Sequence, residues 1–248
     1  MKFEGFYGNK RIKEYLSNAV SRGEISHAFM FSGPEGIGKR TLGGIFARAL
    51  VCQADGEKPC GTCAACIKSG KDSHPDILHI RRSGASIKVD EIRALKQDAY
   101  LRPNDGARKV YLIHEADSMT QEAQDALLKI LEEPPAFTVF LLLCYNEKMM
   151  LETVRSRCVR LTLSPLDGDE MSSLLGERFP LLGKEERELL IARSRGIAGR
   201  ALSPHEDGPA EESALRIISA ASEGDELKIA ESMIAITPNI SCFLISNF

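Results

Sequence analysis

The feature that most constrains this chain is a glycine-rich loop, Gly33-Pro-Glu-Gly36-Ile-Gly38-Lys39, between an apolar run and a helical pattern. Its spacing is that of a phosphate-binding loop in the required context of strand, turn and helix. Glycines let backbone N–H groups wrap phosphate oxygens, and the helix N-terminus adds a favourable partial charge. Gly33, Gly36 and Gly38 would form the cradle, and Lys39 would reach the β and γ phosphates. A glycine-rich turn without a ligand is the alternative, but the combined context favours the phosphate loop.

Residues 1–165 alternate between predicted strands and helices. Short apolar runs predict strands at 27–32, 76–80, 110–113, 138–143 and 159–163. Helical spacing predicts helices around 12–20 and at 41–51, 89–100 and 121–133. Strands separated by helices indicate an α/β fold whose parallel sheet is covered on both faces. Ligands of such sheets bind at the carboxyl ends of the strands, where the glycine loop lies.

The pattern changes after Ser164-Pro165-Leu166. Short helices are expected at 167–179, 185–195 and 199–203, so 166–205 would form a small three-helix unit. The polar segment 203–209 reads as a linker because it contains two prolines and a glycine. Residues 206–248, with a helix across 210–236, are expected to begin an all-α domain that is cut short at the chain end.

The magnesium side of the glycine loop departs from the motif at its first ligand. The motif requires Ser or Thr after the lysine, but this residue is Arg40. Thr41 comes one position late, and one helical step turns a side chain by about 100°. Thr41 is therefore not expected to substitute.

The second magnesium contact should be an aspartate that ends a later strand. His114 stands there, while Glu115 keeps the usual water-orienting position. Asp117 could compensate only if the loop shifted, and an ordinary strand-end histidine is the simpler interpretation of His114. We therefore expect weak or magnesium-independent binding of ATP, a doubtful Mg²⁺ site and no useful hydrolysis.

Four of the seven cysteines, Cys52, Cys60, Cys63 and Cys66, lie within fifteen residues. In a cytosolic chain this clustering indicates a metal site rather than disulfides. Four thiolates suit a structural, tetrahedral Zn²⁺ with no open position for catalysis. An iron–sulfur site is an alternative, but its pattern continues with x3-Cys-Pro, and position 70 is Gly70. Free thiols are the other alternative.

Charge and hydropathy exclude several classes of protein. The chain has 248 residues, 32 of them basic and 35 acidic, and a formal net charge of −3. A whole-molecule basic field for nucleic acid is absent, so any DNA contact would be local or made by partners. No run of 18 apolar residues and no apolar signal segment at the start occur, so we expect a cytoplasmic protein without membrane contact.

Six motifs occur in a specific order. They are the glycine loop, the four cysteines, His74-Pro-Asp76, His114-Glu115-Ala-Asp117, Leu127-Leu-Lys-Ile-Leu-Glu-Glu-Pro-Pro135 and Ser156-Arg157-Cys158. In this combination the chain resembles the clamp-loader subunits of bacterial DNA polymerase III, namely delta prime and the related gamma/tau. The resemblance covers about residues 5–205.

The resemblance implies an AAA+ domain over 1–165 with a zinc module at 52–66, a helical lid at 166–205 and a helical collar domain from 206. It also implies a hetero-oligomeric ring of five subunits, with gamma/tau and delta as partners. The ring opens the sliding β clamp and sets it on primed DNA, within a DNA polymerase (nucleotidyltransferase) holoenzyme. A collar that ends at 248 would leave stable ring assembly in doubt.

Three further roles are implied by the resemblance alone. Arg157 would be an arginine finger that reaches ATP on the neighbouring subunit, where a fixed cation stabilises developing phosphoryl charge. Arg155 is a weaker candidate, and an ordinary surface salt bridge is the alternative for Arg157. Asn146 resembles a polar sensor of the γ phosphate, and Arg200 resembles a second sensor on the lid. Each of these could instead be a helix cap or a solvated charge.

Arg40 and His114 favour delta prime, because its members often lose both magnesium ligands yet keep Ser-Arg-Cys. We therefore expect a delta prime-like stator that lacks intrinsic ATPase activity and donates Arg157 to a neighbour. One alternative is a gamma/tau-like ATPase motor subunit with unusual metal ligands. Another is a zinc-stabilised AAA+ adaptor outside replication.

Overall fold

Five parallel strands form the centre of the structure. They are β1 (Ala28–Ser32), β2 (Ile77–Ile80), β3 (Lys109–Ile113), β4 (Thr138–Cys144) and β5 (Val159–Thr162). The strand order is β2-β3-β4-β1-β5, and every pairing is parallel. Because all paired strands are parallel, each connection must return to the other end of the sheet, and the connections carry helices. The predicted α/β fold with a parallel sheet is confirmed.

The computed structural model describes residues 1–202, and Met1–Ala201 fold as one unit. The expected linker, the helix at 210–236 and the collar at 206–248 lie outside the described residues, as do positions 203–205 of the lid. Within the described part, no helix is long and apolar enough to cross a membrane.

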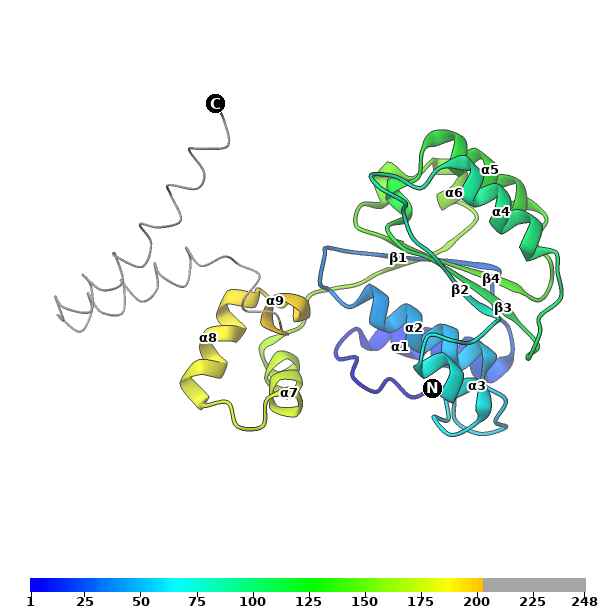
Figure 1. Cartoon of the computed structure of the whole chain (residues 1–248). Coiled ribbons are helices and arrows are strands. Elements are labelled where there is room, and N and C mark those ends of the chain that lie inside the picture. Colours follow the sequence, from blue (N-terminus) through cyan, green and yellow to red (C-terminus); the bar gives the residue numbers. More distant parts are fainter. Residues whose placement is uncertain (203–248) are drawn as a thin grey trace, which may run out of the picture. The chain divides into compact units, whose positions relative to one another are not determined.

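Helices cover both faces of the sheet (Figure 1). On one face lie α1 (Lys10–Arg22), α2 (Lys39–Val51) and α3 (Ala64–Gly70), and on the other lie α4 (Val89–Ala99), α5 (Gln121–Glu132) and α6 (Glu152–Arg155). Successive strand residues point to opposite faces. Accordingly, Phe29 and Phe31 pack on Phe46 of α2, while Met30 between them belongs to the core under α4 and α5.

Local signals explain where the helices begin and end. Gly23 closes α1 in the left-handed region, with φ of 72°. Thr120 caps α5 by accepting the N–H of Ala123, and Pro134-Pro135 follow its end. Four elements too short for a periodic signal are not predicted from the sequence: α3, α6, η1 (Ala116–Ser118) and η2 (Glu147–Met149).

Three helices follow the sheet: α7 (Gly168–Arg178), α8 (Lys184–Ser194) and α9 (Ala198–Leu202). An asparagine near the N-terminus holds the connection that leads to them. The side chain of Asn9 donates to the carbonyl of Ser164 at 3.1 Å and accepts its N–H at 2.8 Å. The start of the chain therefore orders the segment between β5 and α7.

Candidate functional site

The glycine loop joins β1 to α2, and its glycines adopt backbone conformations that other residues avoid. The φ angles are 146° at Gly33, 74° at Gly36 and 104° at Gly38. Gly38 directly precedes α2, a helix of 13 residues. The residues predicted to cradle phosphate thus lie together between the carboxyl end of a strand and the N-terminus of a helix, where anions bind.

Lys39 folds back over its own loop. Its Nζ donates to the carbonyls of Gly33 at 2.6 Å and Pro34 at 2.8 Å, and the ring of Tyr145 covers it with its centroid 4.2 Å away. Lys39 is only 7% exposed, and this burial lowers its pKa to about 8. A bound phosphate would supply the full negative charge that two carbonyls and a ring supply only in part.

Arg40 binds the glutamate of the water-orienting position. Nη2 of Arg40 lies 2.8 Å from Oε1 of Glu115, and Nε of Arg82 lies 2.7 Å from Oε2. Two cations therefore balance one carboxylate. Sequence reasoning missed Arg82, because the residue is far from Glu115 in the chain and carries no motif. The Thr41 side chain is exposed and makes no contact that would replace the missing ligand.

His114 follows β3 at the position of the expected aspartate. Its Nε2 lies 3.0 Å from Nδ1 of His79 on β2, and the two rings stack. Burial lowers the pKa of His114 to about 4, so the ring is neutral at pH 7. Mg²⁺ prefers oxygen ligands and negative charge. The histidine pair supplies neither.

Asp117 orders the segment after β4. Its Oδ2 accepts the N–H groups of Tyr145 at 3.0 Å and Asn146 at 2.9 Å. The Asn146 side chain in turn accepts the N–H of Lys148 and caps η2. Because β4 pairs with β1, Asn146 emerges at the same edge of the sheet as the glycine loop. The Asp117 carboxylate thus holds the segment after β4 by accepting hydrogen bonds from the backbone of that segment.

Helix α9 touches the glycine loop through two glycines. The N–H of Gly199 donates to the carbonyl of Gly36 at 2.8 Å. A Cβ on Gly199 would lie 2.6 Å from the Gly36 Cα, which is closer than real contacts allow. Arg200 follows directly, with an exposed side chain. The residue predicted as the second sensor therefore adjoins the loop contact.

Arg157 lies in the turn between α6 and β5. Its Nη2 is 2.9 Å from Oε1 of Glu132, and its Nη1 donates to the carbonyl of Thr153 at 2.9 Å. Arg155 pairs instead with Glu152. A guanidinium has five N–H donors, so Arg157 keeps donors for another molecule.

Arg157 and the glycine loop lie at opposite ends of the parallel strands: Arg157 at their amino ends and the glycine loop at their carboxyl ends. Arg157 precedes β5, whereas Gly33 follows β1, and Val159 of β5 pairs with Phe29 of β1. A strand of four residues spans about 13 Å. The arginine is therefore not brought to the phosphate loop of its own chain.

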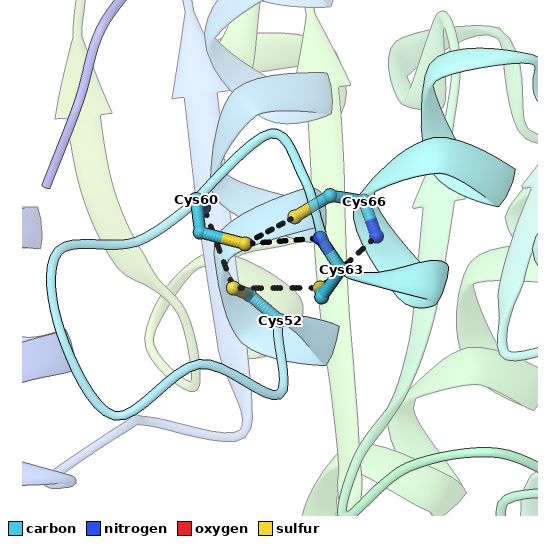
Figure 2. A group of neighbouring side chains, drawn as sticks. All are labelled: Cys52, Cys60, Cys63 and Cys66. Atoms are coloured by element: carbon cyan, nitrogen blue, oxygen red, sulfur yellow. Dashed lines mark hydrogen bonds between the residues drawn. The ribbon is translucent and has the colours of Figure 1, made fainter.

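Four cysteines converge between α2 and α3. Figure 2 shows Cys52, Cys60, Cys63 and Cys66 with their sulfurs gathered in one place. All four sulfurs lie within 4.8 Å of one another, with 4.0 Å between Cys52 and Cys63 and 3.9 Å between Cys60 and Cys66. Tetrahedral coordination with bonds of about 2.3 Å places sulfurs about 3.8 Å apart. The cluster can therefore hold a metal ion.

Backbone N–H groups point at the cysteine sulfurs. Cys63 donates to Cys60 at 3.3 Å, and Cys66 donates to Cys63 at 3.4 Å (Figure 2). The bond from Cys63 is the main reason that the pKa of Cys60 falls to about 5, whereas burial raises the pKa of Cys66 to about 12. A divalent cation deprotonates its thiol ligands. The arrangement fits four thiolates around one ion.

Solved structures of two other proteins share the fold of this chain. RuvB of Thermotoga maritima, a Holliday junction branch migration motor, matches with a TM-score of 0.54 and 18% identity, over 94% of this chain and 70% of RuvB. Domain III of the T. maritima replication initiation protein DnaA matches with a TM-score of 0.52 and 13% identity, over 96% of this chain and 95% of the DnaA chain. At such identities the likeness shows the fold alone, which is an AAA+-like fold.

Sequence comparison then gives the family. The family described as "DNA polymerase III, delta subunit" matches residues 8–167. The chain belongs to this clamp-loader family of DNA polymerase III subunits.

Relatives of two kinds are similar to the chain. The delta' subunit of Bacillus subtilis is 33% identical over 168 residues, which are 68% of this chain and 51% of that protein. The delta' subunit of Pseudomonas aeruginosa is 36% identical over 202 residues, 80% of this chain and 61% of that protein. The tau subunit of B. subtilis is 30% identical over 243 residues, 96% of this chain and 39% of that protein. The chain thus spans about half the length of these relatives.

Proposed function

We propose that the chain is a delta prime-like stator, which helps the clamp loader place the sliding β clamp on primed DNA without hydrolysing ATP itself. The magnesium side of the site carries this proposal. Arg40 pairs with Glu115 where a hydroxyl ligand is required, and neutral His114 stands where a carboxylate is required. Phosphoryl transfer relies on a metal ion that neutralises developing charge. Similarity to delta' and tau alone does not choose between them, so the choice rests on these residues.

The phosphate side supports weak nucleotide binding that does not need Mg²⁺. The positive φ angles of Gly33, Gly36 and Gly38, and the position of Lys39 against the Gly33 carbonyl, support a phosphate cradle. Arg40 adds a permanent positive charge at the sequence position of the expected magnesium ligand. Thr41, Glu115, Asn146 and Arg200 belong to this site by their positions around the loop.

Arg157 would act in trans as an arginine finger. Its place at the amino ends of the strands, opposite the glycine loop, supports service to a neighbour rather than to its own chain. Glu132 and the Thr153 carbonyl hold the guanidinium, so less side-chain entropy is lost when it meets a phosphate.

The remaining assignments follow from the same proposal. Cys52, Cys60, Cys63 and Cys66 would hold a structural Zn²⁺ in a cytoplasmic protein. The sheet domain over 1–165 and the lid over 166–205 would join a collar that begins at 206. The partners would be gamma/tau, delta, the β clamp and, through the assembled complex, primed DNA.

The test of the stator role is an ATPase assay on the isolated chain, with and without Mg²⁺. We expect no turnover above background in either condition, because two ligands of the metal are replaced. Turnover comparable to that of a gamma/tau subunit would contradict the stator and favour the motor.

Arg157→Ala tests the finger in a reconstituted loader that contains this subunit. We expect turnover at the adjoining site to fall by about 10³-fold or more, since arginine fingers contribute about that much, while assembly is retained. Arg160→Ala is the control, because Arg160 is an exposed arginine that lies within β5 rather than in the turn before it. Equal DNA-stimulated turnover in wild type and Arg157→Ala would refute the role.

A gamma/tau-like motor is the second candidate, and the retained Lys39 and Glu115 favour it. If the chain were such a motor, Glu115→Gln would abolish a measurable Mg²⁺-dependent turnover. In a stator there is no such turnover to lose.

A further inference from the structure

A small cavity lies between the middle of α2, the turn after α3 and the start of β2. Its volume is about 40 Å³, and its lining includes Gly44, Arg48, Asp72, His74 and His79. One water molecule needs roughly 10–15 Å³ on this kind of measure. The cavity therefore accepts a group of several atoms.

His74 lines this cavity and has an unused proton. The residue is 4% exposed, and its Nδ1 accepts the N–H of Asp76 at 3.1 Å. A neutral imidazole that accepts at Nδ1 carries its proton on Nε2. That buried Nε2 has no hydrogen-bond partner in the chain. A buried donor without an acceptor costs about 1–3 kcal/mol, so a ligand atom that accepts this proton would stabilise the site.

Arg48 presents a second unused donor. Its Nε is buried and has no hydrogen-bond partner. Arg48 also brings a permanent positive charge, because a guanidinium does not lose its proton in proteins. The two residues that carry these unmet donors, Arg48 on α2 and His74 before β2, line the same cavity.

Gly44 lines the cavity from the side of α2. A Cβ added at this position would meet nothing within 4 Å. Glycine inside a helix costs about 1 kcal/mol relative to alanine. A larger side chain can therefore be introduced at this position to fill the cavity.

The donors define the chemistry of the ligand. Both unmet groups are N–H donors, and one is cationic, so the ligand offers acceptor atoms and negative charge. A metal ion is excluded at His74, because its Nε2 carries a proton. Asp72 at the rim opposes an anion, but its side chain is 75% exposed and lies 3.9 Å from Nε2 of His79. Solvent screens that charge.

We propose that this cavity binds a small oxyanion of the phosphate class, held by Nε of Arg48 and Nε2 of His74. The site is separate from the glycine loop, because Lys39 does not line it. The ligand is either free phosphate or the terminal phosphoryl group of a larger molecule.

The test follows the imidazole signals of the zinc-loaded full chain by NMR while inorganic phosphate replaces chloride at constant ionic strength. His74→Asn identifies the His74 signal, because Asn has no imidazole, while its side-chain carbonyl can still accept the Asp76 N–H. We expect a saturable shift of this signal in wild type and in Lys39→Ala. Arg48→Gln should weaken the apparent affinity at least tenfold, whereas Arg93→Gln, an exposed arginine of α4, should leave it unchanged.

Two further variants make the site testable if Arg48→Gln fails to fold. Gly44→Leu fills the cavity from the side where space exists and should abolish the shift. Asp72→Asn removes the opposing charge and should tighten binding several-fold. Binding of phenyl phosphate as well as phosphate would indicate a phosphoryl group on a larger molecule, and binding of phosphate alone would indicate the free ion.

Two outcomes would overturn the proposal. A His74 signal that does not respond to phosphate would mean that the cavity holds only water. A response that is lost in Lys39→Ala but kept in Arg48→Gln and Gly44→Leu would place phosphate at the glycine loop alone.

Discussion

The two sides of the proposed nucleotide site can be compared residue by residue. On the phosphate side, three left-handed glycines shape the loop before α2, and Lys39 lies over it. On the metal side, Arg40 binds Glu115, and His114 binds His79. In the proposed site, one side has the groups that phosphate needs, while the other has nitrogen groups at the positions where oxygen ligands are expected. Under this proposal, binding a phosphate and activating its transfer depend on separable sets of side chains.

The largest expected effect concerns the phosphate side. Lys39→Ala should weaken binding of a fluorescent ATP analogue by about 100-fold, because a buried, charge-assisted contact is lost. Wild type should bind with a similar Kd in Mg²⁺ and in EDTA. Lys10→Ala at the exposed start of α1 is the control. An unchanged Kd in Lys39→Ala would remove the phosphate side from the comparison.

The metal side should reveal itself through pH. The lowered pKa of His114 means that the native ring stays neutral while the unfolded ring takes up a proton below about pH 6.5. Stability is therefore full above pH 6.5 and is lost as the pH falls towards 4. With a native pKa of about 4, the loss between pH 7 and 5 is about 2 kcal/mol.

Urea unfolding of wild type and His114→Gln at pH 7 and pH 5 measures how much of the loss of stability comes from His114. His27, His74 and His79 also have pKa values lowered by burial, so the variant should keep part of the pH dependence. An equal loss of stability in both proteins would mean that His114 does not titrate as its burial requires.

The smallest effect is expected for a double variant that restores oxygen ligands on the metal side. Arg40→Thr combined with His114→Asp restores one hydroxyl and one carboxylate, which are the oxygen ligands that Mg²⁺ takes. We expect Mg²⁺ to tighten ATP binding by about tenfold in the double variant and not in wild type. Each single substitution should give less than the pair. If Mg²⁺ leaves the Kd for ATP unchanged in the double variant, as in wild type, the absence of these ligands does not explain the difference between the two sides.

Much of the fold could be predicted because its signals are local. The apolar runs predicted all five strands, with differences of a residue at their ends. A run of apolar residues is a local signal, so it can be recognised from the sequence. Short elements such as α3 and α6 could not be predicted, because one or two helical turns are too short to show the spacing of apolar residues that marks a helix. The spacing of Cys60, Cys63 and Cys66 also predicted their convergence, since two-residue gaps keep ligands close.

The sequence by itself determined the glycine loop, the two altered magnesium positions, the cysteine cluster and the family. Each depends on residue types at short, fixed spacings. Only the tertiary structure decided which residues meet: Arg82 with Glu115, Tyr145 with Lys39, and Gly199 with Gly36. Most of these partners lie in loops that follow different strands. Their contacts depend on the order of the strands, which brings distant segments to one edge of the sheet.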